Sequence, residues 1–271
     1  MARRVLLTGA AGLLGTWLRR TAPRDVELTS LVRATPVGGR TVVADLRDPG
    51  ATQIAVRAAA PDLVVHAAYA VDERSIVDAS ANVARAAAAC GAELLLVSTD
   101  AVFAGDGQRR DEDAEPDPVW DYGRWKARAE AGADALAPGA TIVRLPLVVS
   151  LDPDDGAAAR IRQAAARGEA TTWFDDERRQ PANAGELARA LWAIALRPAD
   201  RRAGCWHLMG SERLSRHQIG QRTAAALGTD ADLVRAEPTP DGLARPRDLH
   251  LGDDRARREV GWAPTPIVDR A

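Results

Sequence analysis

Tyr122 and Lys126 are the residues whose types and spacing point most clearly to chemistry. Lys126 is the single lysine among 36 basic residues, and Tyr122 is one of two tyrosines. A lysine is a compact charge on a flexible stem, so its use in an arginine-rich chain indicates a role that arginine does not fill. A tyrosine, with a pKa of about 10, becomes an acid–base group at neutral pH only when a nearby cation stabilises its phenolate. The two side chains share one face of the helix predicted over 120–135. An amphipathic helix with an exposed lysine is the alternative.

A glycine-rich turn lies near the start of the chain, where the apolar run 5–8 stops and leucines then recur at helical spacing. It contains Gly9, Gly12 and Gly15. In such a turn two glycines let the backbone bend and approach a pyrophosphate, and the third lets helix and strand pack closely. The helix N-terminus presents free N–H groups to the phosphates. We expect a dinucleotide-binding turn, with a plain strand-to-helix turn as the alternative.

Two residues at strand ends bear on the choice of cofactor. Arg33 follows the predicted strand 26–32. Folds that prefer NAD usually place an acid there, whereas an arginine can pair with the extra phosphate of NADP. This favours NADP(H) over NAD(H), with a solvated surface arginine as the alternative. Asp45 follows the predicted strand 41–44, where it can accept from an adenine amino group or cap the next helix. Asp48 is also placed for that cap, because a proline follows it.

The fourth and fifth predicted strands end in residues suited to a ligand site. The fourth ends in Ala67 and Ala68, whose small side chains leave room for a cofactor backbone. The fifth, 94–97, is followed shortly by Thr99 and Asp100. A hydroxyl and a carboxylate at a central strand tip lie where doubly wound sheets bind ligands.

The alternation of strands and helices predicts an α/β fold, a doubly wound parallel sheet of the Rossmann type. Its sixth strand is predicted over 141–149, and the acidic, turn-rich segment 105–118 is expected to be a surface loop. We expect residues 1–150 to form an NADP-binding domain. Residues 151–271 are expected to form a smaller, interleaved substrate lobe, with the helix near 184–197 packing back on the first domain.

Composition narrows the class of partner. The net charge of −2 and the pI of about 6.1 indicate no basic field for nucleic acid. No segment approaches the roughly 20 apolar residues that span a bilayer, so we expect no membrane contact and a cytoplasmic protein. Cys90 and Cys205 are too few for a disulfide framework and are expected to be buried. The four histidines lack metal-ligand spacing, so no metal is expected. Small molecules or other subunits remain as partners.

These motifs, in this order, resemble the extended short-chain dehydrogenase/reductase family and, within it, the dTDP-4-dehydrorhamnose reductase-like branch. The resemblance covers most of the chain and rests on 8–15, 98–105, 122–126 and 245–248. It implies that Thr99, Tyr122 and Lys126 are catalytic. Thr99 is expected to hold the substrate oxygen, and Tyr122 to donate a proton to it as hydride arrives from the cofactor. Lys126 is expected to stabilise the phenolate and to bond the nicotinamide ribose.

The resemblance also implies a cofactor site and a substrate site. The cofactor site comprises Gly9, Gly12, Leu13, Leu14, Gly15, Arg33, Asp45, Leu46, Ala67, Ala68, Tyr69, Asn82, Tyr122 and Lys126. The substrate site comprises Asp100, Val102, Phe103, Leu147 and Arg245. Asn82 lies inside the helix predicted over 72–90, where an asparagine is mildly unfavourable unless it faces solvent or bonds to something specific. In related enzymes the matching position helps to support the catalytic network.

The function that the resemblance implies is an NADPH-dependent carbonyl reductase acting on a 4-keto sugar nucleotide or a comparable biosynthetic ketone. One alternative is an epimerase or dehydratase on the same scaffold. Another is a non-catalytic, cofactor-binding subunit resembling the regulatory subunit of methionine adenosyltransferase. Ala101 replaces a tyrosine of the branch, and Leu147 replaces an aromatic residue. Both positions touch the sugar in the family, which favours a carbonyl compound of different shape. Family members are often dimers, so a homodimer is a further expectation.

Overall fold

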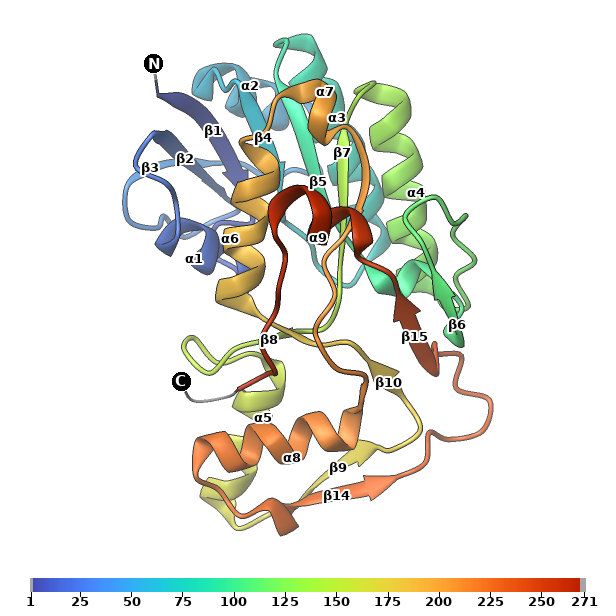
Figure 1. The fold of residues 1–271 in the computed structure, drawn as a ribbon. Helices are drawn as coiled ribbons and strands as arrows, with labels where there is room; N and C mark the ends of the chain where they lie inside the picture. Colours follow the sequence, from blue (N-terminus) through green and yellow to red (C-terminus); the bar gives the residue numbers. More distant parts are fainter. Residues whose placement is uncertain (1, 269–271) are drawn as a thin grey trace.

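A parallel sheet of seven strands forms the centre of the structure, a computed structural model that describes residues 2–268 (Figure 1). All neighbouring strands in this sheet pair in parallel. Their spatial order is β12 (Gly204–His207), β7 (Thr141–Leu145), β5 (Glu93–Thr99), β4 (Leu63–His66), β1 (Arg3–Thr8), β2 (Val26–Val32) and β3 (Arg40–Val43). Because the chain crosses between non-adjacent strands, helices must cover both faces.

The sheet buries apolar side chains on both faces. Along β1, Val5 and Leu7 belong to one hydrophobic cluster, whereas Leu6 belongs to the other. In β5, Leu95 faces the first cluster and Leu96 the second. Successive side chains of a strand point to opposite faces, so a strand covered on both sides requires a continuous apolar run. This explains why these segments were recognisable from composition alone.

Two groups of helices form the outer layers. The helices on one face are α1 (Leu13–Arg20), α6 (Ala184–Ala195) and α9 (Asp254–Val260). The helices on the other face are α2 (Pro49–Ala59), α3 (Ala79–Ala89) and α4 (Asp121–Leu136). A π-helical turn, η1 (Arg74–Asp78), leads into α3. Asp48 caps α2 by accepting from the backbone N–H of Ala51. The predicted doubly wound fold is confirmed, and the helix expected near 184–197 packs on the main sheet.

A smaller region lies below the carboxyl ends of the main strands (Figure 1). It contains α5 (Gly156–Arg167), α8 (Arg216–Leu227), and the parallel pair β9 (Thr171–Phe174) and β14 (Val234–Glu237). A second sheet has the order β13 (Leu214–Ser215), β10 (Arg178–Arg179), β15 (Asp248–Leu251) and β6 (Asp106–Arg110). Shorter elements are the pair β8 (Val148–Val149) and β11 (Ala182–Asn183), helix α7 (Ala199–Arg202), and the 3-10 turns η2 (Asp100–Val102) and η3 (Ala231–Leu233).

Three elements differ from the prediction. The sixth strand ends at Leu145 because Pro146 has no N–H for the ladder, and the chain resumes as β8 beside β11. The segment 105–118 is not only a loop, since β6 within it pairs with β15. Its polar residues carry no alternating apolar pattern that would reveal a strand. Strand β12, from the second half of the chain, joins the main sheet beside β7 and was not predicted.

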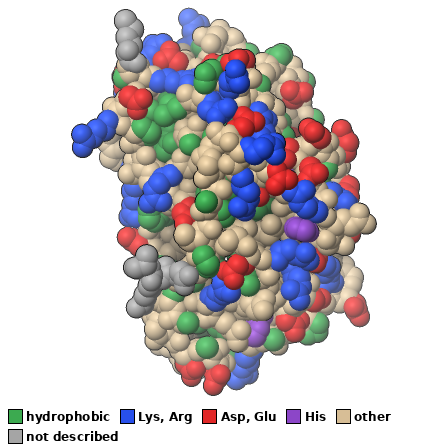
Figure 2. Space-filling view, in the orientation of Figure 1, with side chains coloured by type: hydrophobic (Ala, Val, Ile, Leu, Met, Phe, Trp, Pro, Cys, Tyr) green, Lys and Arg blue, Asp and Glu red, His purple; other side chains and the backbone are tan. Residues whose placement is uncertain are grey.

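The described residues contain no helix long and apolar enough to cross a membrane. Basic and acidic side chains are interspersed on the face shown in Figure 2. This surface therefore carries no extended field of one sign, in keeping with the small net charge. Both cysteines are unpaired and half-buried, which corrects the expectation that they are buried.

Candidate active site at the carboxyl edge of the main sheet

The glycine-rich turn has the shape that a pyrophosphate requires. Gly9 has a φ of +70°, and a Cβ there would lie 2.7 Å from the backbone of Ala68. A Cβ on Gly15 would lie 2.1 Å from the carbonyl oxygen of Gly9, so strand and helix can approach only because both residues are glycines. Helix α1 begins after Gly12 without a side-chain cap and without an acid in its first turn. The first N–H groups of α1, including those of Leu13 and Leu14, therefore fit an anionic ligand.

Polar contacts hold this turn against the end of β4. The hydroxyl of Thr8 lies 2.7 Å from Nδ1 of His66 and accepts from the N–H of Ala68 at 3.3 Å. Nε2 of His66 lies 3.1 Å from the hydroxyl of Ser80 on α3. Burial, with the nearby charge of Lys126, lowers the pKa of His66 to about 3, so its ring is neutral at physiological pH. The backbone at Ala67 and Ala68 is thereby fixed beside the turn.

Arg33, Asp45 and Arg47 lie together where β2 and β3 end. Arg33 is exposed. Asp45 forms an ion pair of 2.6 Å with Arg47 and also accepts from the backbone N–H of that residue. The hydrogen bonds with Arg47 lower the pKa of Asp45 to about 2, and the charge of Arg33 contributes. An adenine amino group would have to share a carboxylate that Arg47 already engages. The sequence analysis did not single out Arg47, because only the fold shows that it turns back on Asp45.

Asn82 and Leu46 contact each other. The amide nitrogen of Asn82 donates to the carbonyl oxygen of Leu46 at 3.0 Å, and Arg85 donates to the amide oxygen at 3.3 Å. Asn82 therefore ties α3 to the loop after β3. These hydrogen bonds do not run to Thr99, Tyr122 or Lys126, although the resemblance implies that Asn82 supports those residues.

The structure brings the three expected catalytic residues to one place. Tyr122 and Lys126 lie on the first turns of α4, and Thr99 ends β5 beside them. Thr99 lies close enough to Tyr122 to oppose the rise in its pKa, and its hydroxyl donates to Oδ1 of Asp100 at 3.1 Å. The ammonium group of Lys126 donates to the carbonyl oxygen of Val97 at 3.2 Å and lies 5.3 Å from the ring centroid of Tyr69. The rings of Tyr69 and Tyr122 are 6.3 Å apart, so Tyr69 flanks both residues.

Burial changes the acid–base properties of this group. It lowers the pKa of Lys126 to about 8, against the opposing charge of Glu130. It raises the pKa of Tyr122 well above its usual range, and Tyr69 and Asp100 add to this shift while Thr99 opposes it. A phenol in this state holds its proton firmly and can release it only to a base that forms during reaction. Activation of Tyr122 by Lys126 stays a prediction.

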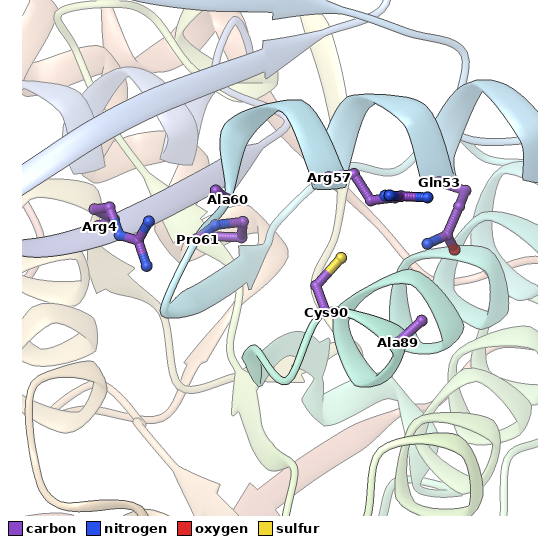
Figure 3. A pocket seen from close by; sticks show the side chains of 7 residues that line it. All are labelled: Arg4, Gln53, Arg57, Ala60, Pro61, Ala89 and Cys90. Carbon is purple, nitrogen blue, oxygen red and sulfur yellow. The ribbon is translucent and has the colours of Figure 1, made fainter.

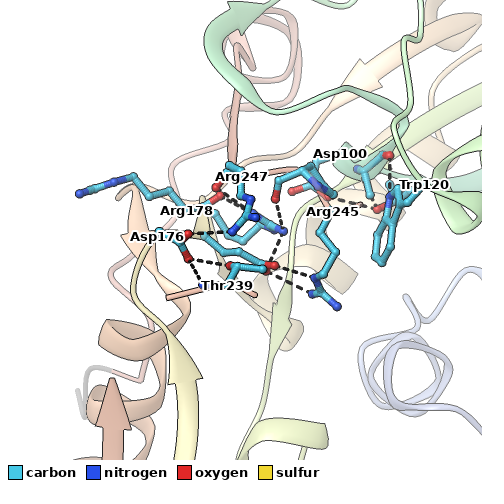
Figure 4. A network of polar contacts seen from close by, with 12 residues as sticks. Asp100, Trp120, Asp176, Arg178, Thr239, Arg245 and Arg247 are labelled. Carbon is cyan, nitrogen blue, oxygen red and sulfur yellow. Dashed lines mark hydrogen bonds and ion pairs between the residues drawn. The ribbon is translucent and has the colours of Figure 1, made fainter. Parts of the chain in front are cut away.

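The residues expected to bind substrate divide into two groups. Val102 and Phe103 are fully buried in a hydrophobic cluster with Met209 and Leu251. Their side chains therefore pack beneath the surface of the site and are not exposed to a ligand. Leu147 is half-buried and packs against another apolar cluster. Asp100 and Arg245, in contrast, belong to a polar network between the main sheet and the smaller region (Figure 4).

Asp100 is the carboxylate next to Thr99, one of the residues expected to be catalytic. It is 5% exposed, and its Oδ1 accepts from the hydroxyl of Thr99 at 3.1 Å. Its Oδ2 is buried and has no hydrogen-bond partner. Burial raises the pKa of Asp100 to about 6, and the charges of Arg179 and Arg216 act in the opposite direction. A carboxyl group with one unsatisfied buried oxygen is unusual and indicates a site for a further proton or ligand.

An arginine cluster, formed by Arg179, Arg216 and Arg245, lies near Asp100. Glu177, which is fully buried, pairs with Arg245 at 2.6 Å and with Arg179 at 3.2 Å. Burial and the two neighbouring guanidinium groups lower the pKa of Arg216 to about 10. Glu177, Asp100 and Asp155 all act on this cluster, so its guanidinium groups form a mixed-charge network in which Arg245 is more exposed than Arg179.

Aromatic rings flank the arginine cluster. The guanidinium carbon of Arg245 lies 5.2 Å from the ring centroid of Trp120 and 5.8 Å from that of Phe174. The Trp120 ring in turn packs on Tyr122, with centroids 5.3 Å apart. The sequence analysis missed Arg179, Arg216 and Trp120. The run 175–179 reads as a charged surface segment, and only the fold buries part of it beneath Arg245.

A hollow at the opposite edge of the sheet belongs to no part of this site (Figure 3). Arg4 at the start of β1, Arg57 near the end of α2, Pro61 before β4 and Cys90 after α3 line it. In a parallel sheet these positions lie at the amino ends of the strands, away from Thr99. The side chains that could take part in a reaction therefore lie at the carboxyl edge of the sheet.

Comparison with known proteins identifies a family and several relatives. Residues 3–267 match the model of the family described as RmlD substrate binding domain. A probable dTDP-4,6-dihydroxy-2-methyloxan-3-one 4-ketoreductase of Streptomyces antibioticus is 32% identical over 96% of this chain and 90% of its own length. Methionine adenosyltransferase 2 subunit beta of Bos taurus is 28% identical over 93% of this chain and 81% of its own length.

The fold is also shared with solved structures. A dTDP-4-dehydrorhamnose reductase of Bacillus anthracis, crystallised in complex with NADP, superimposes with a TM-score of 0.81. The match covers 99% of this chain and 95% of that one, at 20% sequence identity. At this identity the similarity supports the fold and not the details of the site.

Proposed function

Since the chain belongs to the RmlD substrate binding domain family, we propose that it is an NADPH-dependent reductase of a 4-keto sugar nucleotide or a comparable biosynthetic ketone. The observation that carries the proposal is the contact between Tyr122 and Thr99, with Lys126 one helical turn away. The Streptomyces antibioticus relative, a probable 4-ketoreductase, supports the class of reaction.

Each part of the site has a role in this reaction. A bound nicotinamide supplies the hydride. The first turn of α1 binds the pyrophosphate. Lys126 binds the ribose of the nicotinamide. Thr99 orients the carbonyl oxygen, and Tyr122 donates a proton to that oxygen as it gains negative charge. The partner of the site is therefore a small-molecule substrate together with a dinucleotide.

The arginine cluster supports a nucleotide-linked substrate. Arg179 and Arg216 act on the charge of Asp100, and Arg245 acts on that of Arg216, so a diphosphate near Asp100 could pair with their guanidinium groups. The ring of Trp120, which packs on Tyr122, would then contact the sugar. Ala101 stands where the reductase branch has a tyrosine, which supports a substrate of different shape.

The test is NADPH oxidation by the purified chain with dTDP-4-dehydrorhamnose and a panel of other dTDP-4-keto sugars. At least one sugar should be reduced, and Tyr122→Phe should lower kcat by roughly 10²- to 10⁴-fold, the usual contribution of a general acid. Arg124→Ala, an exposed change on the same helix, is the matched control and should retain full activity. Cofactor binding without turnover of any sugar would refute the proposal.

We also propose a preference for NADP(H) over NAD(H), carried by Arg33 beside the ribose position. A cytoplasmic location and a homodimer are further parts of the proposal. Sedimentation of the purified chain tests the dimer, which would have twice the 28.8 kDa mass of the chain. A monomer at micromolar concentration would contradict it.

The second candidate function is that of a non-catalytic subunit. It is favoured by the similarity to methionine adenosyltransferase 2 subunit beta over 93% of this chain. It predicts a stable protein partner whose behaviour is the same with wild type and with Tyr122→Phe. Loss of NADPH oxidation in Tyr122→Phe would exclude this candidate, because a binding subunit needs no proton donor.

A further inference from the structure

Trp120 forms a fixed wall beside the proposed proton donor. It directly precedes α4, and its ring packs on that of Tyr122 with centroids 5.3 Å apart and planes inclined by 70°. This near-perpendicular contact is a favoured geometry for aromatic pairs. Nε1 of Trp120 donates to the carbonyl oxygen of Ala101 at 3.3 Å, and a Cβ on Gly123 would lie 3.0 Å from the indole. The indole is therefore held from the side of the main sheet.

Tyr69 is the second ring beside Tyr122. The centroids of these two rings are 6.3 Å apart, with planes inclined by 55°. Tyr69 is 60% exposed, whereas Trp120 is half-buried. An exposed side chain changes rotamer freely, so Trp120 is the neighbouring ring that can hold Tyr122 in place. The phenolic hydroxyl sits at the end of a rigid ring, and a displacement of that ring moves the proton to be donated.

Arg245 links Trp120 to the smaller region. Its guanidinium carbon lies 5.2 Å from the centroid of Trp120 and 5.8 Å from that of Phe174 on β9 (Figure 4). Both distances are within the range of cation–π attraction. A guanidinium group can contact an aromatic face while its N–H groups bond in the plane of the fork. Arg245 can therefore bind a carboxylate and support the indole at the same time.

The buried carboxylate of Glu177 fixes the direction of this guanidinium group. Nε of Arg245 pairs with Oε1 at 2.6 Å, and Nη2 donates to Oε2 at 3.2 Å. Glu177 is fully buried, so the pair is anchored in the interior of the smaller region. Two parallel contacts between a fork and a carboxylate leave the guanidinium plane little freedom to rotate.

The backbone beside Arg245 is fixed as well. Arg179 donates to the carbonyl oxygen of Pro246 at 2.9 Å. Gly105, between η2 and β6, has a φ of +75°, and a Cβ there would lie 2.6 Å from the Cβ of Pro246. The N–H of Asp248 donates to the carbonyl oxygen of Gly105 at 2.8 Å. The segment that carries Arg245 is thus packed on the segment that leads from β5 into β6.

We propose that Arg245 is a positioning residue that holds the Trp120 ring against Tyr122 and thereby couples the smaller region to the proton donor. The inference rests on the proposed reductase function. Glu177 directs the guanidinium group, which keeps the indole where it supports the phenol ring. Arg245 acts through Trp120 and touches no reacting atom.

The direct test observes the two rings by NMR without substrate or cofactor. The chain has two tyrosines and seven tryptophans, so ¹³C labelling of tyrosine rings and ¹⁵N labelling of indoles give few signals. Tyr69→Phe and Trp120→Phe assign the signals of Tyr122 and Trp120. In Arg245→Ala both should shift, because the indole loses its partner and its ring current at Tyr122 changes. A Tyr122 signal that keeps its wild-type position would overturn the inference.

Two further variants keep the NMR test decisive. Arg247→Ala is the matched control, because Arg247 lies two residues along the same segment and forms a partly exposed pair with Asp176 at 2.7 Å. It should leave both ring signals unchanged, and shifts as large as those in Arg245→Ala would contradict the specific role of Arg245. Arg245→Met keeps a long side chain without the charge or the fork. It should shift both signals, and it decides the question if Arg245→Ala does not fold.

Kinetics supply the functional readout. With NADPH and the dTDP-4-keto sugar that the chain consumes, Arg245→Ala should lower kcat by up to about 100-fold, the cost of misplacing a catalytic group by about 1 Å. The dissociation constant for NADPH should stay unchanged. Trp120→Phe should keep most of the activity, because a phenyl ring can still pack on Tyr122, whereas Trp120→Leu should lose as much as Arg245→Ala.

A double-mutant cycle shows whether Arg245 acts through Trp120. The double variant Arg245→Ala/Trp120→Leu should lose no more kcat than either single variant, because both changes remove one contact. Losses that multiply in the double variant, together with a raised KM for the sugar nucleotide, would overturn the inference. They would show that Arg245 binds the substrate directly.

The two hypotheses fail differently. Shifts of both ring signals in Arg245→Ala, in a chain that reduces no keto sugar, would support the contact through Trp120 and contradict the reductase. An active reductase whose Arg245→Ala variant keeps the wild-type kcat would contradict only the role of Arg245.

Discussion

Burial sets the chemistry of the polar side chains at the carboxyl edge of the main sheet. The same loss of water lowers the pKa of Lys126 to about 8 and raises that of Asp100 to about 6. It also raises the pKa of Tyr122, so all three side chains are biased toward their neutral forms. Lys126 and Asp100 can therefore exchange protons near neutral pH with small changes in free energy, whereas Tyr122 keeps its proton until a base forms during reaction. At the scale of the residue, the site is therefore suited to general acid catalysis.

Arg33 tests the choice of cofactor at this scale. Arg33→Ala should weaken binding of NADPH by about 1 to 3 kcal/mol, because a charge-assisted contact to the extra phosphate is lost. Binding of NADH should change much less. Both dissociation constants can be measured by fluorescence titration. The control is Arg40→Ala, because Arg40, at the start of β3, forms an exposed pair with Glu27. An equal loss for both cofactors would remove Arg33 from the phosphate site.

Helix α4 is the element that positions Tyr122 and Lys126, and a buried ion pair anchors it. Glu130, one turn beyond Lys126, pairs with Arg144 of β7 at 2.8 Å, and both side chains are almost fully buried. Ser98 donates to Glu130, and Arg144 lies 3.3 Å from Nε2 of His207 on β12. The active-site helix is thus tied to three strands, β5, β7 and β12.

The anchor of α4 predicts a large effect on stability. Glu130→Gln leaves the Arg144 charge buried without its counter-ion and should lower the free energy of unfolding by about 3 to 5 kcal/mol. Arg128→Ala is the matched control on the same helix, because Arg128 forms an exposed pair with Glu73 that should contribute at most about 1 kcal/mol. Urea titration measures both. Equal effects of the two changes would show that the buried pair does not anchor the helix.

Elements with strong local patterns were predictable, and those defined by distant pairing were not. The apolar runs of β1, β4 and β5 need burial on both faces, so composition identified them. Strand β6 is polar and exists only because β15, far along the chain, pairs with it. Strand β12 is short and is defined by its pairing with β7. Pro146 could have predicted the end of the sixth strand, since it removes a ladder donor.

At the scale of the whole molecule, the site is completed by segments that lie far apart in sequence. Thr99, Tyr122 and Lys126 come from the first half of the chain and were predicted as a group. Arg179 and Arg216 come from the second half, and no local pattern marks them as neighbours of Asp100. Their proximity follows from the way the smaller region folds below the main sheet (Figure 1). The grouping of Thr99, Tyr122 and Lys126 was thus accessible from sequence, whereas the arginine cluster required the fold.

The central claim is that this chain transfers a hydride to a carbonyl carbon. The most direct measurement uses NADPH deuterated at the transferring position, with the dTDP-4-keto sugar that the chain consumes. We predict one equivalent of NADPH oxidised per sugar, with deuterium on the carbon that carried the carbonyl group. Conversion of the sugar without net oxidation of NADPH and without label in the product would contradict the claim, and would instead indicate an epimerase or dehydratase.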